Sequence, residues 1–317
     1  MTRNFIIGSR GSELALWQAN YVRSSLERSF PENSFEIKII KTIGDERLDV
    51  ALSKIGDKGL FTRQIETELL AGTIDLAVHS LKDLQTVQPD GLVIGAVCER
   101  EVPNDVLISR SVSSIGDLPK RARVATGSLR RRSQLLHFRP DLEIAEIRGN
   151  VPTRLKKFNE SDLDGMILAY AGVHRLGLGE GISHLIPFDI MLPAVGQGAI
   201  AVEVRDGDET VREVVAKLEH TPTRICIKAE RALLRRLEGG CQVPIGAYAT
   251  IHGENLRLEG MVGGLDGVVV FRGSLEGMPL EADRLGIRLA EILIEKGADK
   301  LLTETRIGSE TAAEAVI

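Results

Sequence analysis

The chain has 317 residues, 43% of them hydrophobic and 27% charged, with a formal net charge of -5, which is ordinary for a globular protein of two or three domains. Its three cysteines, without short spacing, indicate neither a disulfide framework nor a zinc site, and no run of about 18 apolar residues could span a membrane. With no signal-peptide pattern at the N-terminus, we expect a cytoplasmic protein that does not act at a membrane.

The N-terminal part of the chain alternates between strand and helix patterns. The expected strands are 4–8, 35–39, 75–79 and 91–97. A helix begins after Ser12, a suitable N-cap, and a second helix covers 60–70. The apolar face expected for the first helix carries Leu14, Trp17, Tyr21 and Val22. Between these elements, the polar and glycine-containing stretch 43–58 is expected to be a long mobile loop.

The same alternation restarts near residue 106. The expected strands are 122–126, 144–147 and 165–169, and the expected helices are 128–138, 152–158 and 171–176. Alternation at these spacings predicts parallel, doubly wound sheets in two α/β domains with a cleft between them. The segments 99–104 and 193–198 are the candidate hinges. We expect the strand at 199–204 to return to the first domain, followed by a helix at 209–218.

The C-terminal part has a different pattern. A helix at 221–237 leads into a glycine-rich loop that carries Cys241. The runs expected to be strands are 247–252, 256–262 and 268–273, followed by a helix at 280–296. Consecutive hairpins and a helix predict a small α+β domain.

Positive charge is concentrated in one segment. Residues 120–157 carry a net charge of +8, so the rest of the chain carries -13. Such asymmetry predicts an anionic ligand. A pI of 5.8 and only 4% aromatic residues argue against nucleic acid, and a small polyanion fits better.

Arginines follow three successive predicted strands, where open α/β sheets bind ligands. Ser128 opens a helix whose N-terminus attracts anions, and Arg130 and Arg131 occupy its first turn. The remaining members of this set are Arg148, Arg154 and Arg175. Arginine pairs with carboxylates through two parallel hydrogen bonds, so the pattern indicates a polycarboxylate ligand. A solvated basic face is the alternative for the first motif alone.

Two further residues are candidates for chemistry. Asp83 is an acid in a predominantly basic site, where it could stabilise a developing cation and move protons. For a single aspartate in isolation, a solvated ion pair in a turn is the more common case. Cys241 follows two glycines on its loop, which leaves its sulfur accessible to a bulky group, although a lone cysteine is more often an inert packing residue.

Together these segments resemble the porphobilinogen deaminases (hydroxymethylbilane synthases) over nearly the whole chain. The motifs that carry the resemblance are GSRGS at 8–12, LALWQ at 14–18, KGLF at 58–61, DLAVHSLKDL at 75–84, SLRR at 128–131, RGNV at 148–151, PAVGQG at 193–198 and LEGGCQVPIG at 237–246. Small departures occur at Gln85, Gly127 and His174, where the family more often has proline, serine and a longer basic residue.

The resemblance implies the head-to-tail condensation of four porphobilinogen molecules with loss of ammonia, giving hydroxymethylbilane. It also implies a dipyrromethane cofactor joined to Cys241 by a thioether. Asp83 would be catalytic. The residues implied to bind the cofactor are Lys82, Ser128, Arg130, Arg131, Arg154 and Arg175. Those implied to face the substrate are Arg10, Ser12, Arg148 and Arg154.

The fold expected from pattern and resemblance has two doubly wound, periplasmic-binding-protein-like α/β domains with a hinge, plus a small C-terminal α+β domain. The expected boundaries are 1–98 with 199–218, then 105–192, then 220–317, with 43–58 as the active-site lid. The expected partners are porphobilinogen and the growing oligopyrrole, without nucleic acid, membrane or metal, and the chain is expected to be a monomer. A two-domain solute-binding or ligand-sensing module is the alternative, but it would not account for Cys241 or Asp83.

Overall fold

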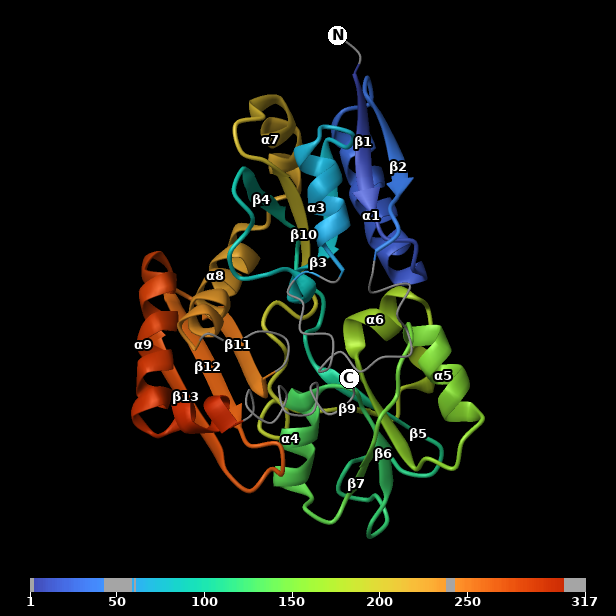
Figure 1. Ribbon diagram of the computed structural model, residues 1–317, viewed down its shortest axis with the longest axis vertical. Coiled ribbons are helices and arrows are strands. Elements are labelled where there is room, and N and C mark those ends of the chain that lie inside the picture. The colour runs from blue at the N-terminus through green and yellow to red at the C-terminus, as the bar shows by residue number, and fades with distance from the viewer. Residues whose placement is uncertain (1–2, 43–58, 60, 238–242, 305–317) are drawn as a thin grey trace, which may run out of the picture. The chain divides into compact units, whose positions relative to one another are not determined.

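The computed structural model describes residues 3–42, 59, 61–237 and 243–304 (Figure 1). This part of the chain forms two compact units. One contains the described residues up to 101 together with 198–224, and the other contains 102–197 and the chain from 225 onward. The expected lid at 43–58 lies outside the described residues.

The first unit is built on a five-stranded sheet in the order β2-β1-β3-β10-β4. Its strands are β1 (Asn4–Ser9), β2 (Ser34–Ile39), β3 (Leu76–Ser80), β4 (Leu92–Val97) and β10 (Ile200–Arg205). The predicted return of the chain to this sheet is confirmed by β10. The expectation of parallel strands is wrong for β10, which runs antiparallel to both neighbours. The chain re-enters the sheet at the end where β3 stops, with Ile200 opposite Ser80, so β10 must run the other way.

Helices cover both faces of this sheet. Residues of α1 (Glu13–Ser29), α7 (Glu209–Val215) and η4 (Ala216–Leu218) pack on one face, and those of α3 (Arg63–Leu70) on the other. The short helix η2 (Leu81–Asp83) follows β3. The Ser12 side chain caps α1, as expected, by accepting a hydrogen bond from the Ala15 N–H. The predicted apolar face of α1 is partly wrong: Trp17 and Tyr21 are 36% and 40% exposed and stack on each other. The face that packs on the sheet instead carries Gln18, Ala19, Val22 and Leu26.

The second unit contains another five-stranded sheet, in the order β7-β6-β8-β5-β9. Its strands are β5 (Asp105–Ser109), β6 (Arg123–Ala125), β7 (Glu143–Ala145), β8 (Gly165–Ala169) and β9 (His184–Leu185). β6 is parallel to β7 and to β8, whereas β5 is antiparallel to β8. The carboxyl ends of β6, β7 and β8 therefore lie at one edge of the sheet.

The helices that follow these three strands begin within one residue of their predicted starts. They are α4 (Leu129–Phe138), α5 (Val151–Asn159) and α6 (Tyr170–Arg175), with η3 (Gly179–Gly181) after them. Ser128 and Asn150 cap α4 and α5 through their side-chain oxygens, and Pro152 lies in the first turn of α5. Proline is favourable there because its missing N–H has no partner within the helix.

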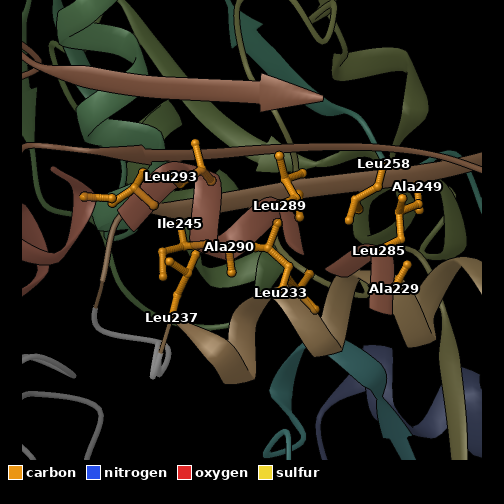
Figure 2. Packing of buried hydrophobic residues seen from close by; sticks show 14 of the residues in the cluster. Ala229, Leu233, Leu237, Ile245, Ala249, Leu258, Leu285, Leu289, Ala290 and Leu293 are labelled. Atoms are coloured by element: carbon orange, nitrogen blue, oxygen red, sulfur yellow. The ribbon is translucent and has the colours of Figure 1, made fainter. Parts of the chain in front are cut away.

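The C-terminal part of the second unit is an antiparallel sheet covered by two helices. The elements are α8 (Thr221–Arg236), β11 (Ile245–His252), β12 (Asn255–Gly263), β13 (Val270–Gly277), η5 (Pro279–Glu281) and α9 (Ala282–Glu295). Figure 2 shows how leucine and alanine side chains of α8 and α9 pack with those of β11 and β12. A Cβ atom at Gly286 would collide with the carbonyl oxygen of Ala229, so this glycine permits the close contact between the two helices. The α+β arrangement is confirmed, although β13 begins and ends later than predicted.

Candidate functional site

A pocket in the first unit lies at the carboxyl ends of the neighbouring parallel strands β1 and β3. It is lined by Arg10, Ser12, Leu14, Ala15, Gln18, Phe61, Thr62, Val78, His79, Ser80 and Asp83. Arg10 follows β1, Ser12 caps α1, and Asp83 ends the short helix η2 after β3. The structure thus brings three of the predicted site residues together. Lys82 precedes Asp83 in the same turn and is partly buried.

Neighbouring side chains hold the walls of this pocket. The guanidinium carbon of Arg10 lies 4.2 Å from the centre of the Phe61 ring, a cation–π contact that fixes the arginine. The Gln18 Nε2 donates to the Ser80 Oγ at 2.9 Å, which ties α1 to the end of β3. Arginine and aspartate therefore face one small space, which suits a ligand with both carboxylate and cationic groups.

In the second unit, Arg130 and Arg131 are buried rather than open to solvent, each 5% exposed. A carboxylate that the sequence interpretation missed, Asp105, lies between them. Its Oδ2 accepts from Arg130 Nη1 at 2.7 Å, and its Oδ1 accepts from Arg131 Nη2 at 2.8 Å and Nε at 3.1 Å. Gln197 donates to the same Oδ1 at 2.9 Å. The sequence did contain one signal for this residue, because Asp105 begins an apolar strand. A carboxylate buried in that position requires a charged or hydrogen-bonding partner.

The charges in this cluster do not cancel. Burial raises the pKa of Asp105, but the two guanidinium groups outweigh burial and hold that pKa far below its usual range. Two arginines and one aspartate leave one positive charge in excess. Within the described residues, Nε and Nη2 of Arg130 make no hydrogen bond, so they remain available to a ligand carboxylate.

The loop around Gly149 positions two further predicted arginines. Arg154 Nε donates to the Gly149 carbonyl at 2.7 Å, and Arg148 Nε lies 3.8 Å from the Glu146 Oε2. Gly149 has a φ of 117°, a conformation that favours glycine. Arg175 ends α6. Because β6, β7 and β8 are parallel, the segments bearing Ser128, Arg148 and Arg175 leave the same edge of the sheet, as the sequence predicted.

The helix α4, which carries Ser128 and the buried arginines, packs against the C-terminal sheet. Arg132 Nε donates to the Leu265 carbonyl at 3.1 Å, and His137 Nδ1 lies 2.9 Å from the Gly267 carbonyl oxygen. Cβ atoms at Gly263 and Gly267 would collide with α4, so these glycines allow the contact. The arginine-bearing helix is thereby fixed to the C-terminal sheet, which follows Cys241 in the sequence.

The segment 192–197 is also tied into this unit. The Leu192 carbonyl accepts from Arg130 and from Gln134, and the Gly196 N–H donates to buried Glu230 of α8 at 2.9 Å. Within the predicted hinge 193–198, Gln197 bonds to Asp105 of the arginine cluster, and Leu192 just before the hinge bonds to Arg130.

The predicted attachment residue, Cys241, lies outside the described residues. Cys98 and Cys226 are both buried, 2% and 7% exposed, consistent with packing roles. Across the described ranges, no group of histidine, cysteine and acidic side chains could hold a metal ion. No described helix is long and apolar enough to cross a membrane.

Two family models match most of the chain. The model described as porphobilinogen deaminase, dipyromethane cofactor binding domain, matches residues 5–213, and the model of the porphobilinogen deaminase C-terminal domain matches 224–295. The chain belongs to the porphobilinogen deaminase family. The family models and the named relatives favour this enzyme over a solute-binding module.

Porphobilinogen deaminases of known sequence cover the chain almost completely. The enzyme of Carboxydothermus hydrogenoformans is 54% identical over 306 residues, covering 96% of this chain and 98% of the relative. That of Chlorobium luteolum is 53% identical over 310 residues, covering 96% and 99%. Among solved structures, the methionine-binding protein MetQ matches 68% of this chain and 89% of the MetQ chain. The TM-score is 0.44 and the sequence identity is 13%, so the likeness is weak.

Proposed function

We propose that this porphobilinogen deaminase is a hydroxymethylbilane synthase, which joins four porphobilinogen molecules head to tail with loss of ammonia. The observation that carries the proposal is the pocket in which Asp83 lies with Arg10 and Ser12. Porphobilinogen carries an ammonium group, a pyrrole N–H and two carboxylates. The carboxylate of an aspartate accepts hydrogen bonds from the ammonium group and the pyrrole N–H. An arginine pairs with a carboxylate of the substrate.

Each condensation breaks one C–N bond, forms one C–C bond and removes the hydrogen from a pyrrole α-carbon. Ammonia leaves with the C–N electron pair, and a cation develops on the substrate. The Asp83 carboxylate stabilises that cation and accepts hydrogen bonds from pyrrole N–H groups. The α-carbon proton is finally taken up by ammonia, so no net acid or base is consumed. Asp83 is the group in the pocket suited to hold this proton in transit.

We further propose that the family's dipyrromethane is attached to Cys241 through a thioether. When bound, it supplies the pyrrole α-carbon to which the first porphobilinogen is joined. The excess positive charge around Asp105 and the available donors of Arg130 fit a group that carries several carboxylates. The residues proposed to hold these carboxylates are Lys82, Ser128, Arg130, Arg131, Arg154 and Arg175. Those proposed to bind the incoming substrate are Arg10, Ser12, Arg148 and Arg154.

The remaining proposals concern organisation. The chain would act as a cytoplasmic monomer in three domains, 1–98 with 199–218, 105–192 and 220–317, with 43–58 as the lid. Few cysteines and buried Cys98 and Cys226 are compatible with a reducing compartment. Light scattering of the purified protein tests the proposed monomeric state, and a mass equal to that of a dimer would contradict it.

Replacing Asp83 by asparagine tests the proposed chemistry. The change Asp83→Asn preserves size but removes the charge and the ability to take a proton. We expect the variant to fold and to keep the cofactor, because the arginines bind the carboxylates. Turnover at saturating porphobilinogen should fall by at least about 100-fold. The steady-state rate of ammonia release measures this turnover.

The matched control is Asp90→Asn, which alters an exposed aspartate of the same unit and should leave turnover unchanged. If Asp83→Asn raises only KM while saturated turnover survives, Asp83 is a binding residue and the proposed chemistry is wrong.

A further inference from the structure

Three ionisable side chains lie buried together beneath the pocket of the first unit. They are Glu66 on α3, His79 on β3 and Glu203 on β10, which are 5%, 5% and 0% exposed. The His79 Nε2 lies 3.2 Å from the Glu203 Oε2. In the strand register, Ala201 is opposite His79 and Glu203 is opposite Ala77, so both polar side chains point to the face of the sheet that α3 covers.

The polar atoms of this cluster are poorly satisfied. Among the described residues, the buried side-chain atoms without a hydrogen bond include Glu66 Oε1, His79 Nε2 and both carboxylate oxygens of Glu203. Buried polar atoms in native proteins nearly always have a partner, and unpaired ones indicate a functional role or bound water. Here the His79 Nε2 and the Glu203 Oε2 lie 3.2 Å apart without the geometry of a hydrogen bond, and the charges of both residues act on Glu66. The three side chains can therefore share a proton.

The fold does not require charge at this place. The layer between α3 and the sheet is otherwise apolar, with Ile65, Leu69 and Ile74 fully buried. Buried ion pairs can often be replaced by apolar residues without loss of stability, because removing charges from water is costly. Two glutamates and a histidine in this layer therefore need an explanation other than stability.

The protonation state of the cluster is constrained by its surroundings. With all three groups ionised the cluster would carry one negative charge in an apolar layer, and one further proton would neutralise it. Burial raises the pKa of Glu66, and the negative charge of Glu203 raises it further, which outweighs the opposing effects of Thr62, His79 and Arg63. Glu66 therefore takes up a proton more readily than an exposed glutamate.

The cluster also adjoins the reaction site. His79 and Thr62 line the same pocket as Asp83 and Arg10. Outside the cluster, the charge of Arg63 on α3 acts on Glu66, and Arg10 and Asp83 line the pocket together with His79. The register neighbours of Glu203 are Ala77 on β3 and Ile94 on β4, which carry no charge.

We propose that Glu66, His79 and Glu203 form a proton-holding group behind the pocket, which takes up the pyrrole α-carbon proton after Asp83 accepts it and returns it for ammonia. While the cluster holds the proton, Asp83 is again the carboxylate needed for the next condensation. These three are positioning residues, since they act through Asp83. The inference rests on the proposed role of Asp83.

The test uses the cofactor-loaded enzyme and the variants Glu203→Gln and Glu66→Gln, which keep the shape of the side chain. We expect both variants to keep the cofactor mass and the wild-type melting temperature or a higher one. Turnover at saturating porphobilinogen should fall by about 10- to 100-fold, as when an outer-shell partner of a catalytic group is removed. The acid limb of the turnover–pH profile, which we assign to protonation of Glu66, should disappear in Glu66→Gln. It should move to lower pH in Glu203→Gln, because the charge of Glu203 raises the Glu66 pKa.

The matched control is Glu68→Gln on the same helix, where the carboxylate pairs with Lys38 at the surface. Its pH profile should match the wild type. A readout independent of turnover is the infrared band of protonated carboxyl groups, followed as the pH is lowered. Glu66 should contribute to it at a higher pH than an exposed glutamate, so the band should be weaker in Glu66→Gln. If either variant fails to fold, the other variant and this band decide the question.

Superposition of the variant and wild-type pH profiles, or an unchanged infrared band, would overturn the proposal. If Asp83→Asn is inactive while both cluster variants behave as wild type, the inference about the cluster falls and the proposed function stands. If Asp83→Asn itself retains saturated turnover, the proposed function falls.

Discussion

At the scale of single residues, Asp105 determines what the two arginines of α4 can do. Arginines without an acid partner would be costly to bury, and a fully neutralised pair would attract no anion. One aspartate shared by two arginines gives a buried site that keeps one positive charge and a fixed direction for its donors. The arginines were predictable from the SLRR motif. Asp105 was not, because nothing in the sequence connects it to residues more than twenty positions away.

Removing this carboxylate should destabilise the fold. In Asp105→Asn, two buried guanidinium groups would share a neutral amide. Breaking a buried ion pair by removing one partner typically costs about 3–5 kcal/mol. Urea denaturation of wild type and variant measures the loss at neutral pH. A difference within about 0.5 kcal/mol would contradict the assigned role.

The pH dependence of this contribution has a definite sign. The pKa of Asp105 is depressed in the folded state by Arg130 and Arg131. Its contribution is therefore fully present above the unfolded pKa of about 3.9 and is lost as pH falls through the lower folded value. We expect the stability gap between wild type and Asp105→Asn to be constant from neutral pH to about 5 and to narrow only in strong acid. A gap that narrows between neutral pH and 5 would contradict the depressed pKa.

Charge on the buried face of α4 should be required for loading the cofactor. Arg131→Leu removes two hydrogen bonds to Asp105 and weakens the alignment of Arg130. Charge-assisted hydrogen bonds contribute about 1.5–3 kcal/mol each, so we expect folded protein without the adduct. Arg132→Leu is the matched control, because Arg132 is exposed on the same helix. The intact masses of the two variants show which of them carries the cofactor. A full adduct on Arg131→Leu would refute the role of Arg131 in loading the cofactor.

At the scale of elements, capping and strand signals were read correctly because they are local. Ser12 and Ser128 cap the helices they were expected to cap, and β8 has the predicted bounds. The buried face of α1 was misjudged because Trp17 and Tyr21 are apolar but stack on each other at the surface. Similarly, the direction of β10 depends on where the chain re-enters the sheet, which periodicity does not contain.

The contact between α8 and α9 offers a test at this scale. In Gly286→Ala the new methyl group would meet the backbone of Ala229, which cannot rotate away as a side chain could. Overpacking of this kind costs about 1–3 kcal/mol, more than the helix propensity gained from alanine. Thermal unfolding should show the loss. Gly179→Ala, with no atom near the added methyl group, should change stability little, and equal behaviour of the two variants would contradict the packing argument.

At the scale of the whole molecule, the chain passes three times between its two units, after residues 101, 197 and 224. The Glu101 N–H donates to the Gly198 carbonyl at 3.1 Å in one unit, and Gln197 Nε2 donates to the Pro103 carbonyl at 2.7 Å in the other. The first two passes fall within the segments 99–104 and 193–198 that the sequence marked by their glycine and proline content, and the third lies within α8. The sequence could not show that Gln197 also binds Asp105, which links the second pass to the arginine cluster.

The most direct measurement of the central claim is the intact mass of the purified, active protein. If Cys241 carries the dipyrromethane, the mass should exceed that of the bare chain by two linked pyrrole units. Cys241→Ser should lose this increment. Cys98→Ala and Cys226→Ala should keep it, because both thiols are buried in apolar surroundings. A bare-chain mass for protein that turns over porphobilinogen would contradict the account.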